Sequence, residues 1–555
     1  MAQDGAQANG ESVPPAISGN GRYVVFLSSA SNLVAGDTNS PSAPSANGAQ
    51  RDLGWYVRQR RRTEGEAMSA HAASGAGRVE IEVDDAVKAL RKIDHIVVLM
   101  LENRSFDHML GYLRLTGRRP ELDGLEPGMA NSYHDQSGKF PQYDGLSFGI
   151  HELRDTRMTK AQDPPHDGKS VDKQLAKHNG GFVQAYMDER GGPPEVHPAD
   201  VMGYHTGKHL PVYDHLTEKF CVCDRWFSSV GGATFPNRLY AMAGRADGKR
   251  DNVQPPIYCL HSFVRHLDGV KGVSWANFVH DVTPILWAVD NNYPVHHLLD
   301  EHVAWFDGHF RPPHLGDTFI QRAAAGKLPS VSWIDPSFAD LRTGLMRLIS
   351  PPSNDDHPPS DISLGQALVL KVYDALASSP NWSRTLLVIT YDEHGGFFDH
   401  VPPPLNPPDD NPKVFKRFGV RVPAVVVSPL VGRRTFSHEL FDHTSIIKTI
   451  LLRFARKGGT IPDMGKRVSN AQHLGVLLAG NKPRPAETPE LYRPLAAKID
   501  ANRKDSTHEH LTLGATARAA AKTQLTDLQH DYLTIQSEFT KVLAKVAPDK
   551  LAKFF

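Results

Sequence analysis

The chain has 555 residues, enough for one large α/β domain with additions or for two to three domains. Its 62 basic and 62 acidic residues cancel, so no global field favours binding to nucleic acid. The sequence holds no apolar run of 18 residues, and Cys221, Cys223 and Cys259 are too few for a disulfide framework, although one bridge to Cys259 stays open. The 28 histidines, each a potential metal ligand or acid/base group, favour an enzyme.

Residues 1–85 differ in composition from the rest of the chain and are expected to form an N-terminal arm. The β-type run Tyr23–Leu27, with RDLGWYVR at 51–58 as a continuation, resembles one segment of a TolB-like propeller repeat. One such segment cannot close a propeller, and a partly disordered leader rich in Ser, Ala, Asn and Gly is an equal alternative. The first residues lack the basic and apolar regions of a secretory signal. The expected location is therefore cytoplasmic, or the protein is exported by a non-classical route or after loss of a leader.

The main domain is expected over residues 86–480, and its first strand is the apolar run Ile96–Leu101. Glu102 and Asn103 follow the strand at once, before Ser105 or Asp107 can cap the next helix. Strand, polar cluster and helix in this order place Glu102 and Asn103 at the carboxyl edge of a sheet, where open α/β folds bind ligands.

Two loop segments come next that carry candidate site residues. In DPPH, His166 stands after two prolines on a stiff loop, which suits a phosphate contact or an acid/base group, although a surface histidine would look the same. In GGATFPNR, two glycines precede Thr234 at a predicted helix start, and the start of a helix favours an anion such as phosphate. The alternative is that Thr234 only caps the helix and that Arg238 is a surface charge.

Further along the chain, His297 in YPVHHLLDE is another candidate site residue. VSWIDP at 331–336 is predicted to be a strand that ends in an acid. His357 lies in the proline-rich loop after this strand, before a helix expected to begin near Asp361. VPAVVVSPLV at 422–431 predicts one more buried strand, and residues 481–555 are expected to form a helical extension with Leu525, Leu528, Tyr532 and Ile535 on one face.

The densest cluster of potential ligands is TLLVITYDEHGGFFDH, residues 385–400. Its apolar run 386–389 predicts a strand buried on both faces, which delivers Asp392 and Glu393 to the sheet edge. Two adjacent carboxylates repel unless a positive charge lies between them, and a hard metal ion is the obvious candidate. Gly395 and Gly396 permit a tight turn beside the site, and His394 and His400 are further candidates for substrate contact. The alternative is a polar, solvated turn.

Strands that alternate with helices and end in polar clusters predict an α/β fold with a doubly wound sheet. Every proposed metal ligand offers oxygen, which suits one divalent cation of the hard type: calcium, magnesium or manganese, with iron as a poorer fit. Such an ion between a hydroxyl and a phosphoryl oxygen would lower the pKa of the hydroxyl and offset negative charge.

Six motifs then point to one family: ENRSFDHMLGYL, DPPH, GATFPNRLY, DDHPPSDISLGQA, TYDEHGGFFDHVPPP and FGVRVPAVVVSP. In this order, over about residues 93–455, the chain resembles the bacterial phospholipase C and AcpA-type acid phosphatase family of the alkaline phosphatase superfamily. The resemblance implies an α/β/α sandwich with a mainly parallel sheet, one metal site and a phosphorylated hydroxyl nucleophile.

Matching motif to motif, the resemblance implies roles for individual residues. Metal ligands would be Glu102, Asn103, Thr234, Asp392 and Glu393, and catalytic residues would be Thr234, His166 and His357. Substrate contacts are expected from Asn237, Arg238, His297, His394 and His400. The chain departs from the family at Ala233, where proline is usual, and it shows no twin-arginine leader.

The expected activity is phospholipase C hydrolysis of a phospholipid, in which diacylglycerol leaves and a phosphothreonine is then hydrolysed. A broad phosphomonoesterase using the same site is the first alternative, and a non-catalytic binding protein is the second. The expected partner is a phospholipid or phosphate ester, with transient contact to a membrane surface and without nucleic acid, whereas the sequence does not indicate the oligomeric state.

Overall fold

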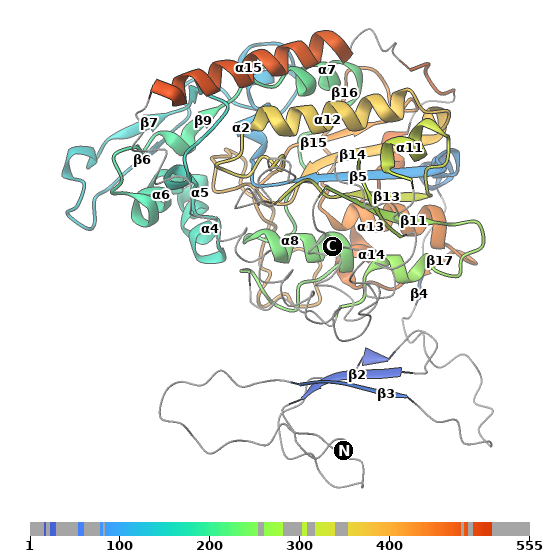
Figure 1. The fold of residues 1–555 in the computed structure, drawn as a ribbon. Helices are drawn as coiled ribbons and strands as arrows, with labels where there is room; N and C mark the ends of the chain where they lie inside the picture. The colour runs from blue at the N-terminus through green and yellow to red at the C-terminus, as the bar shows by residue number, and fades with distance from the viewer. Residues whose placement is uncertain are drawn as a thin grey trace, which may run out of the picture.

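The computed structural model describes residues 84–252, 260–280, 302–307, 317–338, 353–478, 482–486 and 492–512, together with four strands before residue 84. An eight-stranded sheet forms the centre of this part of the chain (Figure 1). In their order across the sheet, the strands are β12 (Val303–Trp305), β11 (Trp275–Val279), β13 (Val331–Ile334), β5 (His95–Leu101), β14 (Thr385–Tyr391), β15 (Ala424–Val427), β10 (Cys221–Cys223) and β16 (Thr435–Ser437).

The two central strands, β5 and β14, are the runs that the sequence marks as continuously apolar. They pair in parallel over seven residues, from Thr385 beside His95 to Tyr391 beside Leu101. All seven residues of β14 are buried, as expected for a strand that is covered on both faces. Because the two strands end at the same level, the residues directly after them, Glu102 and Asp392, emerge side by side at one edge.

The sheet is mainly parallel, as predicted, with one strand reversed. Strands β12, β11, β13, β5 and β14 all run in parallel, whereas β15 is antiparallel to both β14 and β10. A long loop, residues 392–423, connects β14 to β15 without a crossover helix. The chain therefore re-enters the sheet at the edge where it left, which makes the next strand antiparallel.

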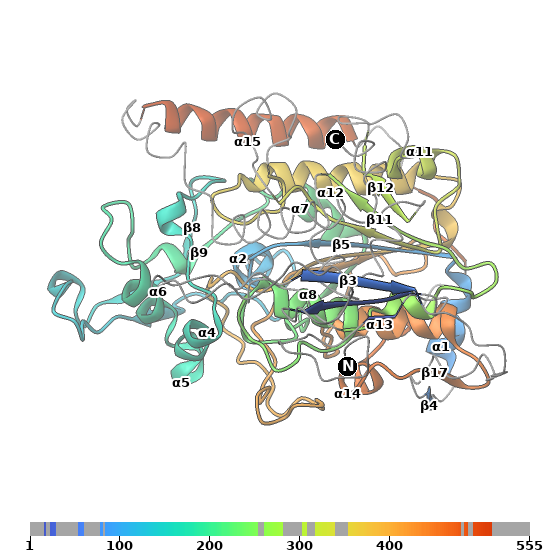
Figure 2. The ribbon, with the colours of Figure 1, turned by 60° about the horizontal axis from the view of Figure 1, so that its bottom comes forward.

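Helices cover both faces of the sheet, giving the three layers of an α/β/α sandwich (Figures 1 and 2). One layer consists of α7 (Pro211–Lys219), α11 (Phe319–Ala324), α12 (Ile362–Ala377) and α15 (Tyr492–Thr512). Within this layer, the long helix α12 lies between the sheet and α15. The opposite layer contains α8 (Thr234–Ala243), α13 (Thr444–Ile450) and α14 (Lys466–Asn470). Each face of the sheet thus buries its apolar side chains against helices.

Local signals in the sequence set several of these helix starts. The side chain of Asp361 accepts a hydrogen bond from Ser363 N, so α12 begins where the sequence predicts. Ser105 caps α2 (Phe106–Leu110) by accepting from His108 N, and α2 continues into α3 (Tyr112–Leu115). This cap leaves Glu102 and Asn103 outside the helix, at the tip of β5.

Residues 130–204 form an insertion with its own small apolar core around Phe182 and Tyr186. Its elements are β6 (Ala130–Ser132), β7 (Ser147–Gly149), β8 (His151–Glu152), α4 (Gly168–Gln174), α5 (Ala176–Asn179), α6 (Phe182–Arg190) and β9 (Gly203–Tyr204). The helices of this insertion lie beyond the end of the sheet at which β5 leads into α2 (Figure 1). The loop that carries His166 therefore reaches the edge with Glu102 and Asp392.

Four strands precede residue 86, where the main domain is expected to begin. Strand β4 (Arg78–Glu80) lies before residue 85 but pairs with β17 (Thr460–Pro462), and α1 (Asp85–Ala89) comes after it. Strands β1 (Ala16–Ile17), β2 (Tyr23–Ser28) and β3 (Gly54–Gln59) form a separate antiparallel sheet, which contains the predicted β run at Tyr23.

At the other end, α15 packs on α12 and α7. The helical face predicted at 525–535 lies outside the described residues, as does Cys259, while Cys221 and Cys223 are free thiols buried in β10. Among the described helices, none has the length and hydrophobicity of a membrane span.

Candidate active site

The tips of β5 and β14 meet in a compact buried cluster. Asn103 N donates to Asp392 Oδ1 at 3.1 Å, and Arg104 N donates to the Glu393 carbonyl at 3.1 Å. Glu102, Asn103, Asp392 and Glu393 are all fully buried. The strand register therefore brings together two pairs of residues that are about 290 positions apart in the sequence.

Four oxygen atoms in this region are buried without a hydrogen bond from any described residue. They are Asn103 Oδ1, Thr234 Oγ1, Asp392 Oδ2 and Glu393 Oε1. Native proteins pair nearly all buried polar atoms, because an unpaired one costs about 1–3 kcal/mol. Oxygen atoms of amide, hydroxyl and carboxylate groups are the ligands that hard divalent cations take. The residues present therefore fit such a cation.

The negative charge of the buried carboxylates also favours a bound cation. Glu102, Asp392 and Glu393 bring three carboxylates to one place, where Arg238 supplies a guanidinium. Burial raises the pKa of Asp392 to about 6, although the Arg238 charge acts in the opposite direction. A buried excess of negative charge is costly, and a divalent cation would offset it.

Asn103 and His166 contact each other in a way that orients both side chains. His166 Nδ1 donates to the Pro164 carbonyl at 2.8 Å, which leaves Nε2 to accept from Asn103 Nδ2 at 3.2 Å. With its amide nitrogen directed at His166, Asn103 presents its oxygen to the carboxylates. Burial alone would lower the pKa of His166, but the Glu393 carboxylate, whose Oε1 lies 4.0 Å from Nε2, raises it above the usual value.

His357 comes to the same place from the other proline-rich loop. Its ring lies 5.7 Å from that of His166 in an edge-to-face arrangement. His357 Nδ1 donates to the Pro358 carbonyl at 2.6 Å, so Nε2 is the nitrogen that remains for another partner. Burial lowers the pKa of His357, and the charge of His166 acts in the same direction. The structure thus brings the two predicted catalytic histidines together.

Thr234 is the first residue of α8, and its hydroxyl does not cap the helix. The N-cap is Ala233, which has no side-chain hydrogen bond, so the capping alternative is wrong. Thr234 lies one helical turn before Arg238, which pairs with Glu102 at 3.0 Å and Asp392 at 3.4 Å. Residues four apart share one face of a helix. Thr234 therefore faces the carboxylate cluster.

Asn237 and Arg238, which the sequence predicts to contact substrate, instead bind other residues of the protein. Asn237 Nδ2 donates to the carbonyls of Val230, Gly232 and Ala233 at 3.1 Å each, and Asn237 Oδ1 accepts from Val230 N at 2.9 Å. Its amide is fully used in shaping the turn before Thr234. Arg238 is 1 % exposed and not a surface charge.

A segment that sequence reasoning missed, Arg250–Asn252, holds this turn against the histidine loop. The Arg250 carbonyl accepts from Ala233 N at 2.9 Å, and its guanidinium donates to the carbonyls of Gly231 and Gly168. Asn252 Oδ1 accepts from Phe235 N at 2.9 Å. Gly168 lies two residues after His166, so Arg250 links the loops of Thr234 and His166. No local pattern in DGKRD reveals this contact, because it forms only in the folded chain.

His394 supports the cluster from behind. Its Nδ1 lies 3.3 Å from Glu393 Oε2, and its Nε2 lies 2.8 Å from Gln174 Oε1. Gln174 in turn donates to the Pro165 carbonyl at 2.7 Å. His394, predicted to contact substrate, is thus 1 % exposed and connects the strand tip to the histidine loop.

His400 lies in a second buried cluster. Its Nδ1 donates to Asp107 Oδ2 at 2.6 Å and its Nε2 to Asp123 Oδ1 at 3.2 Å. Arg421 donates to Asp399 Oδ1 at 2.9 Å and to Asp107 Oδ1 at 3.1 Å. Burial alone would lower the pKa of His400, but the Asp107 and Asp123 carboxylates raise it to about 10. His400 therefore contributes a positive charge to an ion network, and not to the cluster of Glu102 and Asp392.

Ligand atoms of Asp107, Asp399 and His400 lie within 4.8 Å of one another, a spacing that a metal ion could bridge. However, Arg421 and the charged His400 already balance the two carboxylates. The first cluster, whose buried oxygen atoms lack hydrogen bonds from the described residues, is therefore the better fit for a cation. His297, the remaining predicted contact, lies outside the described residues.

The tight turn at Gly395 allows the residues after β14 to pack against the backbone of Asn103. Gly395 has φ +63°, and a Cβ there would overlap the Asn103 carbonyl. Since a displacement of about 1 Å can cost about a hundredfold in rate, we expect Gly395→Ala to lower kcat/KM at least that much. Gly138→Ala is the matched control: Gly138 has φ +68°, with no atom within 4 Å of the place that a Cβ would take. Equal activity of the two variants in a hydrolysis assay would contradict the prediction.

The sandwich fold, the hydroxyl at a helix start and the cluster of oxygen ligands with two histidines define a hydrolase of phosphoester bonds. The chain belongs to the Phosphoesterase family, whose sequence profile matches residues 93–455. This match covers all six motifs, from ENRSFDHMLGYL to FGVRVPAVVVSP.

Named relatives occur in plants and in mycobacteria. Non-specific phospholipase C6 of Arabidopsis thaliana is 33% identical over 384 residues, which cover 64% of this chain and 67% of the relative. Non-specific phospholipase C3 of the same plant is 32% identical over 74% of this chain and 78% of the relative. Phospholipase C A of Mycobacterium tuberculosis is 29% identical over 68% and 75%.

A solved structure with a similar arrangement is the lipoteichoic acid synthase LtaP from Listeria monocytogenes. It is 11% identical, with a TM-score of 0.34 over 78% of this chain and 95% of that chain.

Proposed function

We propose that this protein is a phospholipase C, a metal-dependent enzyme that hydrolyses phospholipid phosphodiesters and releases diacylglycerol through a phosphothreonine intermediate. The observation that carries the proposal is the Thr234 hydroxyl, which has no hydrogen bond among the described residues and lies on the helix face of Arg238, beside buried oxygen ligands that also lack hydrogen bonds. The relatives named non-specific phospholipase C and phospholipase C support the choice of a phospholipid diester.

In the proposed reaction, Thr234 Oγ1 loses its proton to solvent and attacks phosphorus. The new Oγ1–P bond forms as the bond between phosphorus and the glycerol oxygen breaks. The leaving oxygen takes the Nε2 proton of His166 or His357 in its imidazolium form, since Nδ1 of each ring already donates to a carbonyl, and the histidine regains a proton from solvent before the next turnover. Water then attacks the phosphothreonine, which releases the phosphorylated headgroup and restores Thr234.

The cation would be held by Glu102, Asn103, Thr234, Asp392 and Glu393. When bound, it would supply the positive charge that lowers the pKa of the Thr234 hydroxyl and offsets charge on the phosphoryl oxygens. Arg238 keeps Glu102 and Asp392 in place from the buried side, and Asn237 fixes the turn that presents Thr234.

The experiment that tests the proposal compares phosphatidylcholine with p-nitrophenyl phosphate as substrates. The enzyme is first stripped with a chelator and then supplied separately with calcium, magnesium, manganese or ferrous ion. We expect diacylglycerol to appear only with a metal, and chelation to lower the rate at least about a hundredfold.

Other outcomes of this experiment have definite meanings. Cleavage of the monoester alone would replace the proposal with a phosphomonoesterase that uses the same site. Full activity after chelation would contradict the metal requirement. No reaction with any of these metals would favour a binding protein.

A further inference from the structure

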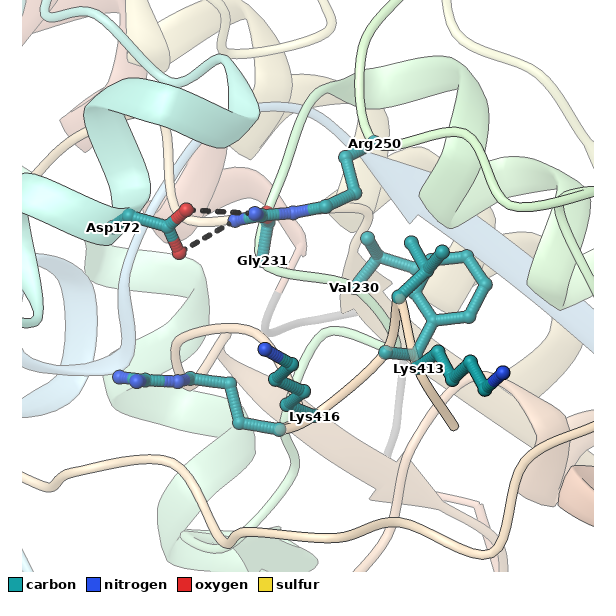
Figure 3. Close-up of a pocket in the computed structure, with 9 residues that line it drawn as sticks. Asp172, Val230, Gly231, Arg250, Lys413 and Lys416 are labelled. Atoms are coloured by element: carbon teal, nitrogen blue, oxygen red, sulfur yellow. Dashed lines mark hydrogen bonds and ion pairs between the residues drawn. The ribbon is translucent and has the colours of Figure 1, made fainter. Parts of the chain in front are cut away.

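A pocket of about 480 Å³ lies beside the turn that leads to Thr234. It is lined on one side by Val230, Gly231 and Arg250, and on the other by the loop 413–417, with Asp172 at its edge. Figure 3 shows the Arg250–Asp172 pair on one side and Lys416 opposite, with the Lys416 amino group turned toward Gly231. The amino group of Lys413 points away from that pair in the same view.

The lining of this pocket is strongly basic. Arg250, Lys413, Lys416 and Arg417 bring four positive charges, whereas Asp172 is the single carboxylate among the lining residues. The negative charge of Asp172 is balanced by Arg250, because both carboxylate oxygens accept hydrogen bonds from its guanidinium, at 2.7 and 2.8 Å. Among the described residues, no carboxylate forms an ion pair with Lys413, Lys416 or Arg417, although the chain as a whole is neutral. The positive charge of these side chains would therefore favour the binding of an anion from outside the protein.

The pocket lies next to the turn that presents Thr234. Gly231 is three residues before Thr234, so the two are separated by at most about 11 Å of chain. Arg250 contributes to both places, since its guanidinium lines the pocket while its carbonyl holds Ala233 N. An anion that contacts Gly231 would therefore lie on the order of 10 Å from the Thr234 backbone.

We propose that this pocket binds a second phosphate group, in addition to the phosphodiester that is cleaved. The inference rests on the proposed phospholipase function and assigns it a preference for anionic lipid. The second phosphate has two possible sources: the headgroup of the same substrate molecule, or a neighbouring anionic lipid in the surface from which the substrate is taken. Lysine and arginine side chains bind phosphate through charge-assisted hydrogen bonds in either case.

The test neutralises the three unpaired cations in the variant Lys413→Gln/Lys416→Gln/Arg417→Gln, measured as the metal-loaded full chain. The substrates are short-chain phosphatidylinositol 4-phosphate and short-chain phosphatidylcholine, both below their micelle concentrations. We expect the ratio of kcat/KM for the first over the second to fall roughly tenfold, the loss of a few partly exposed charge-assisted contacts. Lys139→Gln/Lys271→Gln/Lys327→Gln removes the same charge at exposed lysines that do not line the pocket, and should leave the ratio unchanged.

A second arm measures binding without turnover, in the Thr234→Ala background. Sedimentation with phosphatidylcholine vesicles, with and without phosphatidic acid, shows whether the same three cations hold a neighbouring lipid. A loss confined to the monomeric substrates assigns the phosphate to the substrate molecule, and a loss confined to vesicles assigns it to a neighbouring lipid.

Unchanged substrate ratio and unchanged vesicle binding would overturn the inference. Failure of the proposed function gives a different result, because the parent enzyme would then release diacylglycerol from neither lipid. The binding arm would still decide whether the pocket takes phosphate.

Discussion

Replacing Thr234 with alanine is expected to lower kcat on phosphatidylcholine at least about a thousandfold, because the attacking oxygen is removed. The variant should fold normally. Thr234 is fully buried, and its Oγ1 has no hydrogen bond among the described residues, so alanine breaks no bond and leaves only a small space. The measurement is the rate of diacylglycerol release, together with the free energy of unfolding in urea.

Thr234→Ser is the matched control, since it keeps the hydroxyl and removes only a methyl group. It should retain a rate within about a hundredfold of the parent, because the nucleophile is present but less firmly oriented. A Thr234→Ala enzyme as active as Thr234→Ser would show that another group attacks phosphorus. A variant that no longer unfolds cooperatively would instead show that Thr234 is needed for the structure.

Replacing Arg421 with methionine is expected to lower the free energy of unfolding by about 3–5 kcal/mol. Arg421 is fully buried and donates to Asp399, to Asp107 and to the carbonyls of Asp123 and Asp224. Its removal leaves buried carboxylates facing each other in a place from which water is excluded. Burial already raises the pKa of Asp399 to about 6 while Arg421 is present. Urea unfolding at neutral pH measures the loss.

Two further variants make this test specific. Arg434→Met removes an exposed arginine that pairs with Glu218 at 2.8 Å, and should cost at most about 1 kcal/mol. Adding Asp399→Asn to Arg421→Met removes one of the stranded charges and should restore part of the stability. If the two arginine variants lost equal stability, the buried network would not contribute as described.

Much of the fold could be predicted from local sequence. Continuous apolar runs such as 386–389 identify strands that are covered on both faces, since only such strands can omit polar residues. Polar clusters directly after these runs identified Glu102, Asn103, Asp392 and Glu393 as neighbours, because parallel strands end at a common edge. Caps such as Asp361 and Ser105 were also readable, because a cap depends only on residues two or three positions away.

The functions of individual polar side chains were less predictable. From the sequence, Arg238 is equally a substrate contact or a surface charge and Asn237 is a substrate contact, whereas their partners in the structure belong to the protein. His400 stands only seven residues after Glu393, yet it joins the Arg421 network, because the chain turns at Gly395 and Gly396 between them. A motif gives the types of residue at a site, but not the direction in which each side chain points.

The sequence by itself therefore determined the fold class, the strands that carry the site and the chemistry of its oxygen ligands, since periodicity, caps and residue types are local properties. Only the tertiary structure decided which histidines approach each other, that Arg250 links two loops, and that the cations of KVFKR border the turn of Thr234. The contact between the two histidines joins segments separated by about 190 positions, and the contact between Arg250 and Gly168 joins residues 82 positions apart. Their geometry depends on how whole layers pack, and no short pattern in the chain contains that information.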